Sequence, residues 1–346
     1  MSHKIGRLLG PLALAGALAL LATACSSGGS TASDPPAQGG SGSSATVTIN
    51  FGDQEQEFET LLTDSGVLNG ASYKVSFVEF GSGPLVDAGF AAHRIDVGEM
   101  GDLPASLAVK SGLPVTAIAV SLPIGASEYL LARPGVTAIS QLRGKPVAYT
   151  TGTAEQAFAL RALHSAGLTQ KDVQQVNVTL QELGTALDSG AAYASVVSVE
   201  QKVDYEQIHP NAVVLATEST VSPPSYGYLL GDNSALANPA KLAAIDDLLK
   251  RVVEAENWAK SHQAQWVTDY YVDVEHQTPA VAKIILAAGG TENYVPISSA
   301  VRSALQQVVA LMASAGAGSD YSVAPLYSAA AEARFAAILQ EVPQND

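Results

Sequence analysis

The chain has 346 residues, of which 47% are hydrophobic, and its 33 acidic against 18 basic residues give a formal net charge of −15. That length predicts about two domains with ample cores, and the apolar content is too high for a largely disordered chain. The acidic balance repels phosphate backbones, so no nucleic-acid partner is expected.

The N-terminal segment has the pattern of a bacterial export signal. Lys4 and Arg7 precede residues 8–24, which carry no charge and end in small side chains, so residues 1–24 are predicted to be a signal peptide. A transmembrane helix is the alternative, but it needs about 20 apolar residues, and Pro11 and Gly16 weaken it further. Removal of this segment would take the formal charge from −15 to −17.

Cys25 is the only cysteine, which excludes an intrachain disulfide framework, and it directly follows the apolar run. The sequence L-A-T-A-C at 21–25 resembles a bacterial lipobox, although Ala22 stands where Leu or Val is usual. A stray cysteine after an ordinary signal is the alternative. Residues 25–44, rich in Ser and Gly, are predicted to be a lipidated cysteine with a flexible tether. We therefore expect an exported protein, lipid-anchored to the outer face of the bacterial cytoplasmic membrane.

From residue 45 the chain alternates predicted strands and helices, first as far as about residue 121. Period-2 and β-rich runs predict the strands, and helical spacing of apolar residues predicts the helices. The strands are expected at 46–51, 73–80, 95–97 and 115–121, and the helices at 55–62, 85–92 and 103–111. This alternation is typical of parallel βαβ units.

The pattern restarts near residue 141 and becomes mainly helical after about residue 225. Strands are expected at 146–150, 176–180, 192–197 and 212–216, and helices at 154–166, 241–260, 279–288, 298–313 and 329–339. Crossovers rich in Ser, Pro and Gly are predicted at 122–128 and 218–228. The predicted domains are a discontinuous first lobe, 45–124 with 226–346, and a second lobe, 125–225. Two connections between two lobes predict a hinge with a ligand cleft beside it.

Signatures of catalysis are scarce in this sequence. It has no G-x-S-x-G elbow and no P-loop, and Val86 stands where a G-x-G-x-x-G motif starting at Gly81 would need its third glycine. The six histidines do not pair at metal-binding spacing. We therefore expect no enzyme activity, metal or cofactor, although a triad of distant residues stays open.

Four loops at the predicted carboxyl ends of strands are candidate ligand contacts, because ligands of open α/β sheets bind there. Small residues let backbone N–H groups approach a ligand, and a helix N-terminus favours an anion. Each loop also has a purely structural explanation as a turn or a cap. The candidates are Gly52, Asp53, Gln54, Gly81, Ser82, Gly83, Gly101, Asp102, Thr151, Gly152, Thr153 and Ala154.

Segments 78–84, 95–104, 142–153 and 161–168 resemble, in order and spacing, the periplasmic substrate-binding proteins of sulfonate, taurine and nitrate importers. The sequence patterns of the first two segments are most similar to those of the alkanesulfonate-binding branch of this family. The resemblance implies a type II periplasmic-binding fold, with two doubly wound α/β lobes joined by a two-strand hinge. It also implies capture of a small molecule and its delivery to an ABC permease, and we expect a monomer.

The second-lobe wall departs from that family. Residues 192–201 read A-Y-A-S-V-V-S-V-E-Q where the family usually has V-D-A-W-x-x-W-D-P-Y, so both tryptophans are missing. Ser195 and Ser198 there predict a larger and more polar pocket, and Gln156 stands where the alkanesulfonate branch tends to have histidine. The remaining candidate contacts are Ser198, Glu200 and Tyr226.

The expected ligand is an anionic sulfur compound bulkier than taurine. Backbone N–H groups at 81–83 and 152–154 would hold it, together with the hydroxyls of Ser82, Thr151 and Thr153. The alternatives are an enzyme similar to the thiamine-pyrimidine synthases, a nitrate or neutral-solute binder, and a protein-binding sensor lipoprotein. The enzyme alternative needs a reactive histidine and lysine that the sequence does not identify.

Overall fold

The computed structural model describes residues 46–289 and 291–345, which belong to one compact unit. The predicted signal peptide, the predicted lipidation site at Cys25 and the predicted tether lie outside these residues. Among the residues that are described, no helix is both long and apolar enough to cross a membrane.

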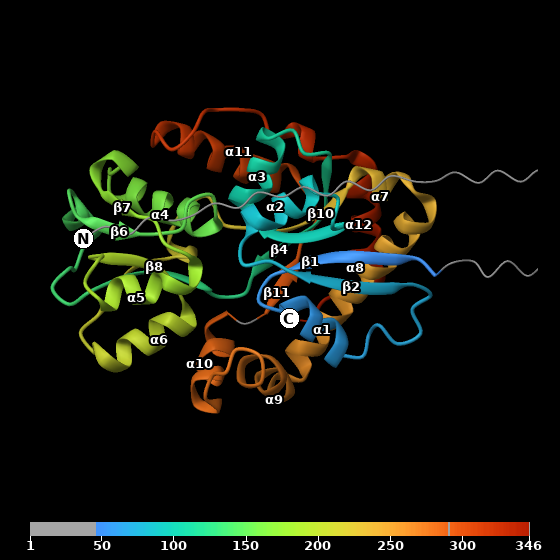
Figure 1. Ribbon diagram of the computed structural model, residues 1–346, viewed down its shortest axis with the longest axis horizontal. Coiled ribbons are helices and arrows are strands. Elements are labelled where there is room, and N and C mark those ends of the chain that lie inside the picture. The colour runs from blue at the N-terminus through green and yellow to red at the C-terminus, as the bar shows by residue number, and fades with distance from the viewer. Residues whose placement is uncertain (1–45, 290, 346) are drawn as a thin grey trace, which may run out of the picture. The chain divides into compact units, whose positions relative to one another are not determined.

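The first of two sheets forms the core of what we call the first lobe (Figure 1). Its six strands are β1 (Thr48–Asp53), β2 (Lys74–Glu79), β3 (Val97–Gly101), β4 (Val115–Pro123), β10 (Gly227–Asp232) and β11 (Glu292–Tyr294). They lie in the order β11-β4-β10-β3-β1-β2, in which β1 is parallel to β2 and β3. β10 is antiparallel to both of its neighbours, and β11 is antiparallel to β4.

The second sheet forms the core of the second lobe. Its strands are β5 (Glu128–Ala132), β6 (Pro146–Ala148), β7 (Gln174–Val176), β8 (Ala194–Ser198) and β9 (Val213–Thr217). Their order is β7-β6-β8-β5-β9, with β6 parallel to β7 and β8, and β5 antiparallel to β8 and β9. The chain passes from the first sheet to the second between β4 and β5, and it returns between β9 and β10.

Helices cover both faces of each sheet. In each sheet the chain first adds a strand on one side of its starting strand and then adds the next strand on the other side. The helices concerned are α1 (Glu57–Asp64), α2 (Gly83–Ala91), α3 (Asp102–Lys110), α4 (Ala154–Ser165), α5 (Leu183–Asp188) and α6 (Val199–Ile208). The chain runs outward from β1 to β2 through α1 and back across β1 to β3 through α2. Since such crossovers are right-handed, α1 and α2 lie on opposite faces, and α4 and α5 do so in the second lobe.

The rest of the chain is mainly helical and returns to the first lobe. It contains α7 (Asn233–Ala237), α8 (Pro239–Ser261), α9 (Gln263–Trp266), a π-helical segment (Val267–Val272), α10 (Pro279–Gly289), α11 (Ser299–Ser314) and α12 (Ala329–Glu341). Asn238 begins α8, and its Oδ1 accepts hydrogen bonds from the N–H groups of Ala240 and Lys241 at 3.0 and 3.2 Å. Ile245 and Val252 on the apolar face of α8 are buried in the first-lobe core, as the helical spacing predicts.

The sequence-based prediction is wrong at several strands of the two sheets. The strand expected at 176–180 already ends at Val176, and a 3-10 turn follows at Leu180–Glu182. β5, β10 and β11 were not predicted. These three strands are antiparallel additions whose partners lie far away in the sequence, so no local βαβ pattern marks them.

A buried ion pair joins the two lobes. Asp102 at the start of α3 binds Arg161 of α4, and the two side chains are 2% and 0% exposed. Arg161 Nη1 also donates to Ser225 Oγ at 2.7 Å, on the segment that returns to the first lobe. Beside this pair, Val308 and Met312 of α11 pack into the second-lobe core. The lobes are therefore connected by packing and charge as well as by the two crossovers.

This pair should be essential to stability because breaking a buried pair leaves a charge without its partner. We expect Arg161→Leu to lower the free energy of unfolding by about 3 kcal/mol, and the double variant with Asp102→Leu to recover much of the loss. Urea denaturation measures both. Arg143→Leu, which breaks an ion pair whose arginine is 61% exposed, is the control and should cost less than about 1 kcal/mol. A double variant that is no more stable than Arg161→Leu would contradict this account.

Candidate functional site

A cavity of about 530 Å³ lies at the carboxyl ends of the parallel strands of both sheets. From the first lobe it is lined by residues at the ends of β1, β2 and β3, including Gln54, Gly81 and Gly101. From the second lobe it is lined by Ala154 at the start of α4 and Ser198 at the end of β8. Its volume and position are those of a small-molecule site in an open α/β fold.

The floor of this cavity is a close contact between the lobes. A Cβ atom on Gly101 would lie 2.7 Å from the Cβ of Ala154, so only glycine fits at this position. Gly101 precedes Asp102 and Ala154 begins the helix of Arg161, which places this contact beside the interlobe ion pair.

Carboxyl groups dominate the charge of the lining. Ten acidic residues line the cavity, and no lysine, arginine or histidine is among its lining residues in the described chain. They are Glu55, Glu57, Glu99, Glu128, Glu155, Glu200, Asp204, Glu218, Glu275 and Glu292. They come from both lobes and from the C-terminal region, so acidic side chains line several sides of the cavity.

Burial and mutual repulsion raise the pKa values of several of these groups. Burial raises the pKa of Glu99 to about 8, and the charges of Glu292 and Asp53 add to the shift. The hydrogen bond that Gln54 Nε2 donates to Glu99 Oε2 at 2.7 Å opposes it. Burial likewise raises the pKa of Glu57 well above its ordinary value, with repulsion from nearby carboxylates as the second cause.

Glu218 and Glu128 contrast in their hydrogen bonding. The carboxylate of Glu218 accepts hydrogen bonds from the backbone N–H and hydroxyl of Ser127 at 3.1 and 2.7 Å. Glu218 thereby ties the first crossover to the end of β9. Glu128 Oε2 is shielded from solvent and has no hydrogen-bond partner among the described residues. Burial raises the pKa of Glu128, and neighbouring Glu155 and Glu218 raise it further.

Aromatic faces complete the lining. Tyr270 and Tyr271 come from the π-helical segment, and Tyr226 comes from the second crossover. Tyr270 stacks on Trp266 with ring centroids 4.8 Å apart and an interplanar angle of 9°. Tyr271 packs edge-on against Tyr270 at 5.1 Å. This rigid aromatic cluster fixes two tyrosines at the acidic wall.

Seven of the residues proposed from the sequence line the cavity: Gln54, Gly81, Gly101, Ala154, Ser198, Glu200 and Tyr226. Eight others do not line it: Gly52, Asp53, Ser82, Gly83, Asp102, Thr151, Gly152 and Thr153. Ser195, expected to enlarge the pocket, is fully buried, and its Oγ donates to Leu183 O at 2.9 Å.

Three donors of the predicted anion-binding loop at 151–154 are occupied within the protein. The N–H of Thr151 donates to Asn177 Oδ1, and the N–H of Gly152 donates to Gln156 Oε1, both at 2.8 Å. Thr153 Oγ1 donates to Thr150 O at 2.8 Å. These three groups are bonded within the protein and do not reach the cavity.

The remaining residues outside the lining have structural roles. The Asp53 carboxylate accepts hydrogen bonds from the N–H groups of Phe58 and Glu59, at 3.1 and 2.8 Å, and so caps α1. A Cβ on Gly52 or Gly83 would lie 2.8 or 2.6 Å from a neighbouring side chain, so these two glycines allow close packing. Ser82 begins α2, and Asp102 belongs to the interlobe ion pair.

Sequence reasoning missed most of the acidic lining. Glu57 and Glu155 lie in the first turns of helices, where carboxylates are common because they complement the helix dipole. Glu99 lies inside the strand β3, and its side chain lines the cavity. The clustering of acidic residues after successive strands was the available signal.

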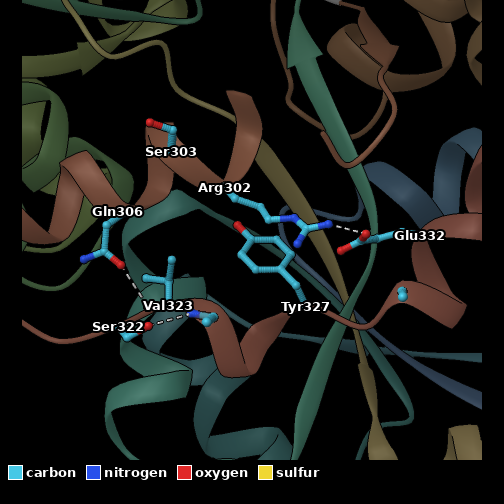
Figure 2. Close-up of a pocket in the computed structure, with 9 residues that line it drawn as sticks. Arg302, Ser303, Gln306, Ser322, Val323, Tyr327 and Glu332 are labelled. Carbon is cyan, nitrogen blue, oxygen red and sulfur yellow. Dashed lines mark hydrogen bonds and ion pairs between the residues drawn. The ribbon is translucent and has the colours of Figure 1, made fainter. Parts of the chain in front are cut away.

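A second cavity, of about 290 Å³, lies between α11 and α12 (Figure 2). Its two charged residues, Arg302 and Glu332, bind each other. Gln306 Oε1 accepts a hydrogen bond from the N–H of Val323 at 3.1 Å. Glu332 Oε1 is buried and has no hydrogen-bond partner among the described residues. We regard the larger acidic cavity as the candidate site because it lies at the strand ends of both sheets.

No metal site is evident in the part of the chain that the structure describes. No group of three or more His, Cys, Asp or Glu side chains there could hold a metal ion. The carboxyl groups of the cavity are spread over its walls and do not converge on one point.

Comparison with known proteins identifies the family to which this chain belongs. The family described as NMT1/THI5 like matches residues 74–263, which is more than half of the chain. A putative aliphatic sulfonates-binding protein of Escherichia coli (strain K12) is 28% identical over 152 residues, which are 42% of this chain and 48% of that protein. The chain thus matches about half the length of this curated relative.

Solved structures share the fold. The alkanesulfonate-binding protein SsuA of Xanthomonas axonopodis pv. citri, bound to MOPS, has a TM-score of 0.72 at 20% identity and covers 82% of this chain and 98% of its own. The periplasmic aliphatic sulphonate binding protein SsuA of Escherichia coli has a TM-score of 0.68 at 21% identity, with 77% and 87% covered. At these identities the likeness concerns the fold alone, and it confirms the predicted periplasmic-binding fold.

The raised pKa values predict how stability depends on pH. A buried carboxyl with a raised pKa binds more protons in the folded than in the unfolded state, so Glu99 stabilises the fold less as pH rises from its ordinary value of 4.5 to about 8. We expect the melting temperature of the ligand-free protein to fall across this range, and Glu99→Gln to make the fall shallower. Circular dichroism at successive pH values measures both.

The control for this experiment is Glu59→Gln, an exposed residue of α1 outside the cavity lining. That variant should keep the pH dependence of the wild type. A melting temperature that rises over the same pH range would show that the buried carboxyls do not govern stability.

Proposed function

The chain belongs to the NMT1/THI5-like family, and from this premise we propose that it is the solute-binding protein of an ABC importer. It captures a small molecule outside the cytoplasm, between its two lobes, and delivers it to a membrane permease. The observation that carries the proposal is the cavity of about 530 Å³ at the strand ends of both sheets. The relatives named above are binding proteins, which supports the same role.

The connections between the lobes support a closing motion around the ligand. The proposed lobes comprise residues 45–124 with 226–346, and residues 125–225. Ile124 and Ala126 in the first crossover donate backbone hydrogen bonds to the C-terminal region, to Thr291 O at 3.0 Å and Ala288 O at 2.9 Å. A hinge braced in this way absorbs rotation at few residues, as hinge closure requires.

The residue types in the cavity favour binding over catalysis. An enzyme similar to the thiamine-pyrimidine synthases would need a reactive histidine and lysine, and neither type is among the cavity-lining residues that the structure describes. The protein is proposed to act as a monomer that meets its permease through the outer surfaces of both lobes. A protein-binding sensor would leave the cavity without an occupant.

The charge of the cavity bears on the ligand. The relatives are named for sulfonates, and the sequence favours an anionic sulfur compound. Ten carboxyl groups line this cavity, however, and no basic residue of the described chain does. Repulsion from that lining opposes a ligand whose only charge is negative. The proposed function therefore specifies a small solute and does not specify a sulfonate.

Filling the cavity should abolish solute binding. Gln181 is an exposed lining residue, so Gln181→Trp inserts an indole into the cavity without disturbing a core. We expect at least one compound in a panel of amines, alkanesulfonates, nitrate and sugars to raise the melting temperature of the wild type but not of this variant. Gln265→Trp, at an exposed position outside the lining, is the control and should respond like the wild type.

Two outcomes would count against solute binding. One is that Gln181→Trp responds like the wild type to every compound that binds. The other is that no compound shifts the melting temperature and no small molecule is released when the purified protein is denatured.

The proposed membrane anchor rests on the L-A-T-A-C sequence at 21–25. Lipid on Cys25 would hold the protein near its permease and raise its effective concentration there. We expect Cys25→Ala to move the protein from the membrane fraction to the soluble fraction, which immunoblotting of the separated fractions detects. A variant that stays in the membrane with the wild-type mass would exclude lipidation at this residue.

A further inference from the structure

Carboxyl groups surround the cavity from three directions. The first lobe contributes Glu55, Glu57 and Glu99, and the second lobe contributes most of the rest, including Glu128, Glu155 and Glu218. Glu292 stands at the start of β11, in the C-terminal region. Repulsion among these groups is relieved either by protonation, as the raised pKa values of Glu57, Glu99 and Glu128 indicate, or by a positive charge that enters the cavity.

We propose that the solute held in this cavity is a small organic cation with one or more amino or ammonium groups. This inference rests on the proposed solute-binding function and names the chemical class of the solute.

Glu128 provides an observation that is independent of the number of acidic residues. Its Oε2 atom is shielded from solvent at the cavity wall and has no hydrogen-bond partner among the described residues. The Glu128 side chain hydrogen-bonds that of Glu155, so the two carboxyl groups form a pair at this wall, and only Oε2 of Glu128 is left without a donor. Arg161, the nearby guanidinium that acts on Glu128, binds Asp102 and Ser225 and does not line the cavity, and its buried Nε has no hydrogen-bond partner among the described residues.

The distribution of the carboxyl groups favours an organic cation over a metal ion. A metal ion needs several ligand atoms around one point, and no such group of side chains occurs in residues 46–289 or 291–345. A cavity of about 530 Å³ has room for an organic molecule, and its charged groups can meet amines at separate positions.

The aromatic residues of the lining fit the same class of ligand. Tyr226, Tyr270 and Tyr271 line the cavity among the carboxyl groups, although one face of Tyr270 is covered by Trp266. Alkylated ammonium groups bind favourably over aromatic faces, which a hydrated metal ion or a sulfonate does not exploit. Carboxylates and tyrosines together therefore match a cation with a carbon skeleton.

Glu57 is the best single residue for a test, because the largest electrostatic influences on it come from acidic and phenolic groups. Its neighbours come from β1, β3, α8, the π-helical segment and β11. They are Asp53, Glu99, Glu256, Tyr270, Tyr271, Glu292 and Tyr294. Lys260 of α8 acts on Glu256 and is bonded to Asn293. A bound cation would favour the ionised forms of these carboxyls, so its affinity should increase with pH.

Isothermal titration of the full chain tests the inference with probes of different charge. The probes are 1,4-diaminobutane, spermidine and choline as organic cations, calcium chloride as the metal, hexanesulfonate as the anion and glucose as the neutral solute. We expect at least one organic cation to bind, and to bind at least tenfold more tightly at about pH 8 than at about pH 6.

A matched pair of variants on one helix locates the binding. Glu57→Gln removes a cavity carboxylate, and Glu59→Gln removes an exposed carboxylate of the same helix outside the lining. The first should weaken binding of the cation at least tenfold, and the second should leave it unchanged. Circular dichroism establishes that both variants fold, and Glu128→Gln should repeat the effect of Glu57→Gln from the opposite lobe.

The outcomes separate this inference from the proposed function. Binding of hexanesulfonate or glucose in the cavity, with none of the three organic cations, would overturn the cation and keep the solute-binding role. Binding of calcium alone would overturn an organic ligand. Equal effects of Glu57→Gln and Glu59→Gln would show that the cation binds elsewhere. If no probe and no co-purified molecule binds, both the inference and the proposed function fail.

Discussion

The ion pair between Asp102 and Arg161 connects the two lobes where they meet. It joins the start of α3 to α4, and both side chains are almost completely buried. The pair lies beside the contact of Gly101 with Ala154, which forms the floor of the cavity. The acidic walls repel one another, and this attraction, the packing of α11 and the two crossovers hold the lobes together against that repulsion.

The same interaction explains why the cavity is acidic without a cation of its own. The positive charge of Arg161 lowers the pKa of Glu128, but Asp102 and Ser225 already bind this guanidinium. The charge of the lining is therefore left for a ligand to neutralise. A cation that enters between the lobes relieves repulsion on both walls, and this provides a physical reason for closure on binding. An anion would increase that repulsion.

Much of the first lobe could be predicted from the sequence, because its parallel strands and helices alternate locally. Gly81, Gly101 and Ala154 were expected at the ligand from their positions at strand ends, and the structure brings them to the cavity. β5 and β10 were not predicted, because their partners are distant in the chain and no local pattern marks antiparallel additions.

The character of the site was harder to predict than its position. The loop at 151–154 was expected to offer N–H groups to an anion, but Asn177 and Gln156 occupy those of Thr151 and Gly152. Which side chain reaches a loop from another segment depends on tertiary packing. The two tyrosines of the wall come from a π-helical segment, which apolar spacing does not reveal. The acidic residues were visible in the sequence, but their convergence was not.

The central claim is that the cavity exchanges protons for a positively charged solute. Calorimetric titration of 1,4-diaminobutane into the full chain at about pH 7, in two buffers of different ionisation enthalpy, measures the protons that move on binding. Because burial holds the pKa of Glu99 at about 8 and raises that of Glu57, a bound cation should release protons from these carboxyls. Proton uptake on binding, or binding of hexanesulfonate with no heat from the diamine, would contradict the account.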